Sequence, residues 1–141
     1  MSLHLIKLAV GVDTLDHLRS VLHGRVEQDP DIGPMVRIRT RMTPKRMDEL
    51  LQGGSLYWVI RGRVAGRSPI LDIRTVETDG RRFCHICVAP GPVAVEARPK
   101  RAFQGWRYLR PEDAPPDAKE VAGADSLPDD MRRELEGLGL L

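Results

Sequence analysis

Aromatic rings close to arginines are the residues of this sequence with the clearest chemical potential. Only six of the 141 residues are aromatic, and five of them fall in two clusters, Tyr57-Trp58 and Phe103/Trp106/Tyr108. Exposed rings beside arginine can stack single-stranded bases, each stack being worth about 1–3 kcal/mol. A domain with so few rings usually buries them. We therefore expect Trp58 and Phe103 in the core. The other three fit either the core or a stacking surface.

Basic side chains would supply the phosphate contacts of such a surface. Residues 36–41 alternate between uncharged and arginine side chains, which predicts a half-exposed strand with its arginines facing water. Further basic residues follow in the next helix and strand. The candidate nucleic-acid- or anion-binding residues are Arg37, Arg39, Arg41, Lys45, Arg46, Arg61, Arg63, Arg67, Tyr57, Trp106 and Arg107.

Cys84 and Cys87 form a C-x-x-C pair, which can be half of a zinc site or a redox centre. Tetrahedral zinc needs two more ligands, and the sequence has no second C-x-x-C and no H-x-x-x-H. A redox pair belongs at the start of a helix. These cysteines lie in an apparent strand, where a separation of three sends their side chains to opposite faces. We expect two buried cysteines, with no metal and no cofactor.

Asp72 is the one acidic residue inside an apolar strand. Strict alternation would put Ile70, Asp72 and Arg74 on one face, and Leu71 and Ile73 on the other. Asp72 then either pairs with a neighbouring arginine, the favoured interpretation because surface ion pairs are common, or acts as a general base. No serine lies in a G-x-S-x-G elbow and no phosphate-loop glycine motif occurs, so no catalytic residue is assigned.

A helix and a strand in the middle of the chain would position these side chains. Thr43 as N-cap and Pro44 at the first helical position predict a helix start. Gly53 suits the left-handed position that ends a helix, and Gly54 lets the chain turn. From 55 to 60 the apolar period changes to two and both faces are apolar, as in a central strand.

The other expected elements are mostly short strands. They are strands at 3–10, 36–41, 70–75, 82–88, 93–98 and 103–109, a helix at 14–23, a polar loop at 25–34 and a hairpin turn at 78–80. With so few helices to cover two faces, we expect an α+β fold with a mostly antiparallel sheet, curled or closed into a small barrel. Residues 1–110 would form this single domain, and 111–141 an acidic, Pro-rich tail, at the surface or disordered, that can hold a short helix near 128–138.

Charge is strongly segregated along the chain although the formal net charge is only +2. Residues 35–110 contain sixteen basic and six acidic residues, whereas 111–141 contain three basic and nine acidic ones. This pattern favours a polyanion-binding face, or else a solvated basic surface that the tail partly neutralises. The sequence has no apolar run of 18 residues and no export signal, which predicts a cytoplasmic protein without a membrane span. Two cysteines also fit a reducing compartment.

Two resemblances bear on identity. A helix that leads through a glycine pair into a central strand, followed by a meander, is similar in element order to the PUA-like RNA-binding barrels. The stretches LHLIKLAVGV, TRMTPKRMDELLQGGSLYWVIRG, ILDIR and FQGWRYLRPEDAPPD resemble an uncharacterised bacterial domain-of-unknown-function family. That resemblance covers roughly residues 3–117. It implies a stand-alone cytoplasmic protein and supplies no activity and no catalytic residues.

Three hypotheses of function follow. The first is a small nucleic-acid-binding module for RNA, or for another phosphate-rich ligand, in which the arginines steer phosphates and Tyr57 or Trp106 stacks a base. The second is an enzyme that acts on a small anionic or phosphorylated substrate in a pocket near Gly53-Gly54, using Arg46, Arg61 and Asp72. The third is a protein-interaction domain whose basic face meets an acidic partner. The sequence leaves the oligomeric state open.

Overall fold

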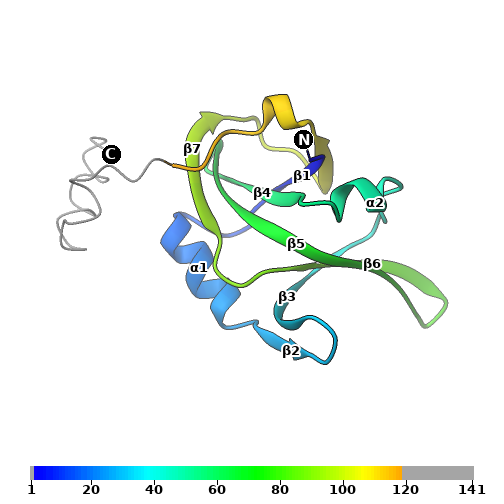
Figure 1. The fold of residues 1–141 in the computed structure, drawn as a ribbon. Coiled ribbons are helices and arrows are strands. Elements are labelled where there is room, and N and C mark those ends of the chain that lie inside the picture. The colour runs from blue at the N-terminus through cyan, green and yellow to red at the C-terminus, as the bar shows by residue number, and fades with distance from the viewer. Residues whose placement is uncertain (1, 119–141) are drawn as a thin grey trace.

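The computed structural model describes residues 2–118, which form one curled β-sheet with short helices (Figure 1). Along the chain the elements are β1 (His4–Leu8), α1 (Leu15–His23), β2 (Glu27–Asp29), β3 (Gly33–Thr40), α2 (Met47–Leu50), β4 (Ser55–Ile60), β5 (Arg63–Thr78), β6 (Arg81–Val88), β7 (Val93–Pro99), β8 (Trp106–Leu109) and the 3-10 helix η1 (Pro111–Asp113). No helix within residues 2–118 is long and apolar enough to cross a membrane.

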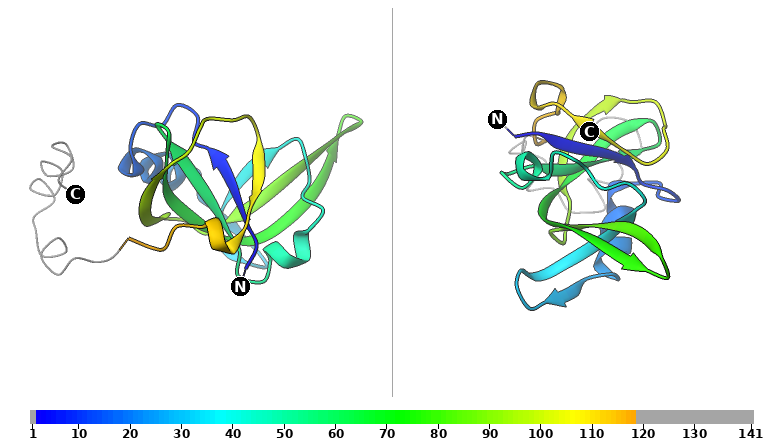
Figure 2. Two further views of the ribbon diagram at one scale, coloured as in Figure 1. Left: turned by 90° about the horizontal axis from the view of Figure 1, so that it is seen from above. Right: turned by 90° about the vertical axis from the view of Figure 1, so that its right-hand side faces the viewer.

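The strands follow the order β2-β3-β6-β5-β4-β1-β8, and β7 pairs with β5. Every neighbouring pair is antiparallel except β1 and β4, which run parallel. The sheet curls round without closing, as the two further views show (Figure 2). The expected α+β fold with a mostly antiparallel, curled sheet is therefore confirmed.

Strand β4 lies between two apolar cores, as its sequence predicts. Leu56, Trp58 and Ile60 belong to the larger core, on the concave face of the sheet, while Tyr57 and Val59 belong to a smaller one on the other face. All six residues of β4 are buried. The alternation of strand faces explains the division, since side chains two residues apart point the same way.

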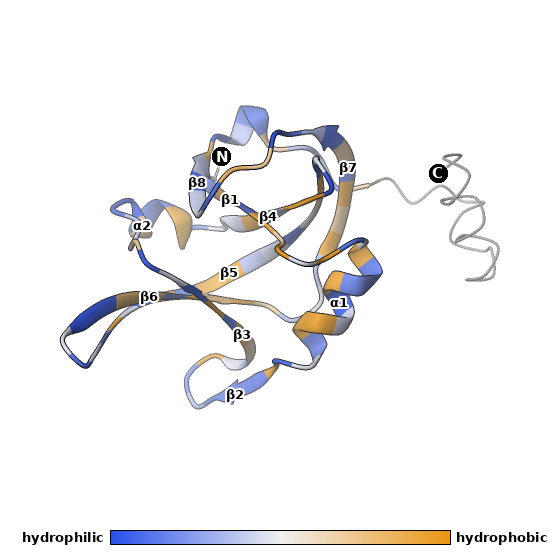
Figure 3. Ribbon diagram, turned by 180° about the vertical axis from the view of Figure 1, so that it is seen from behind, coloured by the Kyte–Doolittle hydropathy of each residue, from blue (hydrophilic) through white to orange (hydrophobic). Residues whose placement is uncertain are grey.

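Helix α1 covers one end of the larger core. Thr14 is its N-cap, and its hydroxyl accepts a hydrogen bond of 3.0 Å from the His17 backbone N–H. Leu18 and Leu22 are buried against the sheet, and the remaining positions are mostly polar, as the hydropathy colouring shows (Figure 3). The helix expected at 14–23 is confirmed.

The predicted helix after Thr43 is much shorter than its sequence signals suggest. Helix α2 begins only at Met47, and the Thr43 hydroxyl lies 3.5 Å from that of Thr75 instead of capping the helix. The ending is as predicted. Gly53 has a φ of +90°, and the Gly54 N–H donates a 2.9 Å hydrogen bond to the carbonyl of Leu50.

Strict alternation along residues 70–75 is also wrong. The pairing of β5 with β6 shifts register between Ile70 and Asp72, which is the mark of a β-bulge. Ile70 and Ile73 consequently both enter the larger core, while Leu71 is 37% exposed. A bulge adds one residue to one strand, so every side chain beyond it changes face relative to a regular strand.

The polar segment 25–34 is not simply a loop, because it contains β2 and forms a hairpin with β3. At the other end, the ordered packing continues past residue 110. Asp117 forms a β-bridge with Val95, and the Ala118 N–H donates to the carbonyl of Ala94 at 2.9 Å. The helix expected near 128–138 lies outside the described residues.

Candidate anion-binding groove

The arginines of β3 face away from the core, as predicted. Arg37, Arg39 and Arg41 are exposed, while Ile38 and Thr40 between them are buried. The guanidinium of Arg39 lies 3.8 Å above the centre of the Phe83 ring, a cation–π contact. Arg37 and Arg39 are held on β3, which fixes their spacing and direction, and Arg41 follows directly after the end of that strand.

Positive charge dominates the surroundings of this strand. His85 on β6 is the register partner of Arg39. Burial lowers the pKa of His85, and the positive charges of Arg37 and Arg39 lower it further. Arg37 lies 3.6 Å from the carboxylate of Glu27. Within residues 2–118, no ion pair involves Arg39 or Arg41.

Lys7 is a site residue that the sequence analysis missed. It sits on β1, directly between Trp58 of β4 and Trp106 of β8 in the register of the sheet. Its neighbours two residues away, Leu5 and Ala9, belong to the larger core, so Lys7 lies on the face of β1 that packs against this core. Burial lowers the pKa of this half-buried lysine. The signal available in the sequence was a lysine at an apolar position of a strand.

Two adjoining cavities meet at Lys7 and Arg39. One, of about 450 Å³, lies between β1, α1 and β3, and its polar lining comes mainly from Lys7, Arg25, Arg37 and Arg39. The other, also about 450 Å³, lies between β3 and β8. Its lining includes Lys7, Arg39, Arg41, Gln104 and Trp106. We call the two cavities together the basic groove.

Five basic residues and no acidic residue line the basic groove. The guanidinium of Arg39 itself lies over Phe83, in a third cavity that Asp79 also lines. The rim of the groove also carries two apolar side chains, Val10 and Met42, which are 78% and 70% exposed. A recess of this kind attracts anions, because low-dielectric walls lined by one sign of charge concentrate the electrostatic potential. It also offers contacts to a flat apolar group.

Trp106 is fixed in place at the rim of the groove. Its indole N–H donates a 2.9 Å hydrogen bond to the carbonyl of Met42, and its ring packs edge-to-face on Tyr108 at 5.1 Å between centres. The Tyr108 hydroxyl in turn accepts a hydrogen bond of 3.1 Å from the Arg46 backbone N–H. These contacts tie β8 to the segment that follows β3, so the two sides of the groove are connected.

Four of the residues predicted from sequence thus gather at the groove, namely Arg37, Arg39, Arg41 and Trp106. Other predicted arginines are each bound to a carboxylate. Arg46 pairs with Glu49, Arg61 with Asp13 at 3.1 Å, and Arg67 with Asp117 at 2.7 Å. The hydrogen bond from Arg67 lowers the pKa of Asp117.

The remaining predicted residues lie elsewhere. Tyr57 is buried, with its ring edge-on to His4, so it presents no face to a base. Arg107 lies over Phe103 at 4.7 Å, on the side of the smaller core. Lys45 and Arg63 are exposed and line neither cavity of the groove. Trp58 is in the core as expected, and Phe103 packs partly buried against the smaller core.

The residues of the enzyme hypothesis do not come together. Each of the three forms an ion pair with a different residue. Arg46 binds Glu49, Arg61 binds Asp13, and Asp72 binds Arg74. Gly54 packs directly against the carbonyl oxygens of Leu3 and Leu50, where a Cβ atom would lie only 2.4 Å from each. The glycine pair therefore serves close backbone packing.

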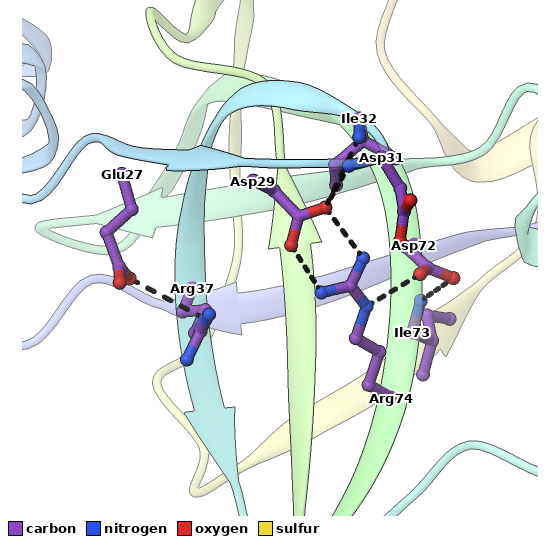
Figure 4. A network of polar contacts seen from close by, with 8 residues as sticks. All are labelled: Glu27, Asp29, Asp31, Ile32, Arg37, Asp72, Ile73 and Arg74. Carbon is purple, nitrogen blue, oxygen red and sulfur yellow. Dashed lines mark hydrogen bonds and ion pairs between the residues drawn. The ribbon is translucent and has the colours of Figure 1, made fainter.

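Asp72 takes part in a structural ion pair, the interpretation favoured from sequence. It accepts a 2.8 Å hydrogen bond from Arg74, whose guanidinium also binds Asp29 (Figure 4). Asp29 further accepts from the backbone N–H groups of Asp31 and Ile32. The bond from Arg74 and these backbone bonds hold the pKa of Asp29 well below its usual range. Arg74 is thereby neutralised.

The cysteine pair forms no reactive centre. Cys84 and Cys87 are both fully buried and form no disulfide, and burial raises the pKa of both thiols. Within residues 2–118, no three His, Cys, Asp or Glu side chains are grouped in a way that could hold a metal ion. The prediction of two buried cysteines is confirmed.

A comparison with protein families matches residues 5–141 to a family described as "Protein of unknown function (DUF1489)". The chain belongs to the DUF1489 family. A comparison with curated proteins found no match, and a comparison with solved structures found none. The resemblance to a family of unknown function is thus confirmed. In this DUF1489 protein, the basic groove is the feature that bears on function.

Proposed function

We propose that the protein binds single-stranded nucleic acid, specifically RNA, in the basic groove. The observation that carries this proposal is the lining of the groove, in which five basic residues and Trp106 occur without any acidic residue. Phosphate contacts supply most of the affinity of such proteins, and aromatic rings supply stacking. Both kinds of contact are present side by side.

Single strands suit the geometry better than a duplex. The groove is a recess between β3 and the β1–β8 edge of the sheet, and Lys7 lines both of its cavities. A base that has left its stack can reach such a recess and lie against a ring. The exposed Met42 and Val10 at the rim offer further apolar contacts to bases.

Fluorescence anisotropy with a labelled single-stranded RNA, measured over a range of salt concentrations, tests the proposal. Each phosphate contact contributes about 0.7 to the slope of log affinity against log salt for single strands. The double variant R39A/R41A should therefore bind more weakly and lose about 1.4 from that slope. Neither arginine is in an ion pair within residues 2–118, and R39A removes only the cation–π contact with Phe83, so the variant should still fold.

A matched control removes the same charge elsewhere. R98A/R110A changes two arginines on β7 and just after β8, neither of which lines the groove. It should keep nearly all of the affinity and the slope. An absence of RNA binding at low salt, or equal weakening by the two double variants, would overturn the proposal. Preference for a duplex of the same length would overturn the single-strand assignment.

A further inference from the structure

The last described residues of the chain are held at a fixed point on β7. The Ala118 N–H donates a 2.9 Å hydrogen bond to the carbonyl of Ala94. Both carboxylate oxygens of Asp117 accept hydrogen bonds from Arg67, at 2.7 Å and 2.9 Å. The segment 119–141 therefore starts from a position that the fold determines.

Helix α1 lies between this point and the cavity of the basic groove that β1, α1 and β3 enclose, which we call the first cavity. On one flank of the helix, Arg19 donates a 3.5 Å hydrogen bond to the carbonyl of Pro92, just before β7 (Figure 3). Val21 and Arg25, on another flank, line the first cavity. A helix is about 10–12 Å across, whereas eleven extended residues span about 36 Å. A segment of that length that starts at residue 119 can thus pass the helix and reach the cavity.

The first part of this segment carries only negative charge. Residues 120–130, EVAGADSLPDD, contain four acidic residues and no basic one. Residues 131–141 contain two basic and two acidic residues, so the excess of negative charge lies close to the point where the segment starts. The match to the DUF1489 family extends through residue 141 and therefore includes this acidic stretch.

The first cavity offers basic residues that lack close carboxylate partners. Lys7, Arg25 and Arg37 are among the residues that line it, and no acidic residue does. Within residues 2–118, neither Lys7 nor Arg25 is in an ion pair, and Arg37 has only a long one, at 3.6 Å to Glu27. Carboxylates spaced along a chain can each meet a different basic side chain. The basic groups therefore do not have to converge on one point.

We propose that the acidic stretch 120–130 docks in the first cavity of its own chain and competes there with nucleic acid. The competition rests on the proposed function, because the carboxylates would take the place of phosphates. Val121 and Leu127 of the stretch match the apolar side chains, Val10 among them, that line the same cavity. Tethering gives such a segment an effective concentration of about millimolar, so weak contacts suffice to hold it.

A spin label on the whole chain tests the position of the stretch. Cys84 and Cys87 are fully buried, so in the variant S126C only the new cysteine is open to a thiol-specific nitroxide. The NMR signal of the Arg25 amide, at the first cavity, should broaden, whereas that of Gly80, at the tip of the β5–β6 hairpin, should not. High salt should restore the cavity signal, because the Debye length falls to about 3 Å at 1 M.

Two outcomes of this measurement would overturn the proposal. One is equal broadening at both places, or none at the cavity. The other comes from a mixture of spin-labelled chains with isotope-labelled chains that carry no spin label. Broadening of the cavity signal in that mixture would assign the stretch to the cavity of a second copy, and so overturn docking within one chain.

Neutralising the stretch tests the competition. Two variants lose the same four negative charges, one from the stretch and one from exposed residues that line no part of the groove. They are E120Q/D125N/D129N/D130N and the matched control D31N/E77Q/E96Q/E112Q. The first should bind labelled RNA about fourfold or more tightly than the control, because each of four exposed ion pairs is worth a factor of about 1.4 or more. Equal affinity of the two variants would overturn the competition.

The two measurements separate this proposal from the proposed function. Broadening at the cavity without RNA binding by either variant would support the docked stretch and overturn RNA binding. RNA binding without broadening at the cavity would overturn the docked stretch and leave RNA binding standing.

Discussion

Arg74 on β5 donates two hydrogen bonds to the carboxylate of Asp29 at the end of β2, at 2.6 Å and 3.2 Å. β2 and β5 are not neighbours, since β3 and β6 lie between them in the sheet. The pair therefore fastens the β2–β3 hairpin over the face of the sheet (Figure 4). Because β3 carries the groove arginines, this contact helps to fix the groove.

Replacing Asp29 by Asn should destabilise the protein at neutral pH. The pKa of Asp29 in the folded protein lies well below its ordinary value of 3.8. Its stabilising contribution is therefore fully present above about pH 4 and is lost as the pH falls below that value. The wild type should lose stability in acid more steeply than D29N, which chemical denaturation at several pH values would measure.

A surface ion pair provides the control for this prediction. Glu77 pairs with Arg82 at 3.1 Å, and both side chains are more than two-thirds exposed. E77Q should change the denaturation midpoint very little, because exposed pairs contribute little to stability. A similar loss in D29N and E77Q would show that the Asp29–Arg74 pair is not special.

Replacing Lys7 by Met should leave the protein at least as stable as the wild type at pH 7. The pKa of Lys7 is lowered from its ordinary 10.5, so the charged form is disfavoured in the folded protein. The wild type should accordingly gain stability as the pH rises toward 10.5, where the unfolded chain still binds the proton. K7M should lack that gain, and thermal unfolding across this pH range would show it. Destabilisation of K7M at neutral pH would contradict the absence of a counter-charge to Lys7 within residues 2–118.

Replacing Gly54 by Ala should destabilise the fold by about 1–3 kcal/mol, the usual cost of forcing extra atoms into a packed site. The new Cβ would lie 2.4 Å from two backbone oxygens. Because both are backbone atoms, no movement of a side chain can relieve this clash. G24A is the matched control, because Gly24 has a helical φ of −68° and its nearest neighbour would be 3.6 Å away. Equal melting temperatures for the two variants would refute the packing role of Gly54.

Replacing Ser68 by Ala should cost about 1–3 kcal/mol, the penalty of an unsatisfied buried polar group. The Trp58 indole N–H donates a 3.0 Å hydrogen bond to the Ser68 hydroxyl, and both residues are buried. In W58F no donor is left, so adding S68A to that variant should cost much less. Strict additivity of the two changes in denaturant unfolding would show that the bond is not a coupled interaction.

Local patterns of the sequence predicted those features that depend on neighbours along the chain. The two apolar faces of β4, the helix at 14–23 and the exposed arginines within residues 36–41 follow from side-chain periodicity, and all were confirmed. Capping signals alone were insufficient at α2. There the Thr43 hydroxyl lies near Thr75, a residue 32 positions away in the chain.

Only the tertiary structure decided which charges are free to bind a ligand. Arg67 is bound to Asp117, a residue 50 positions away, whereas Arg39 lies over a ring and in no ion pair within residues 2–118. The sequence could not separate these two arginines, because electrostatic attraction depends on distance in space. Residue types and spacing thus determined that a basic strand exists. The pairing of β1 with β4 and β8 placed Lys7 between Trp58 and Trp106. Lys7 thereby lines the same cavity as residues of β3, and this arrangement forms the basic groove.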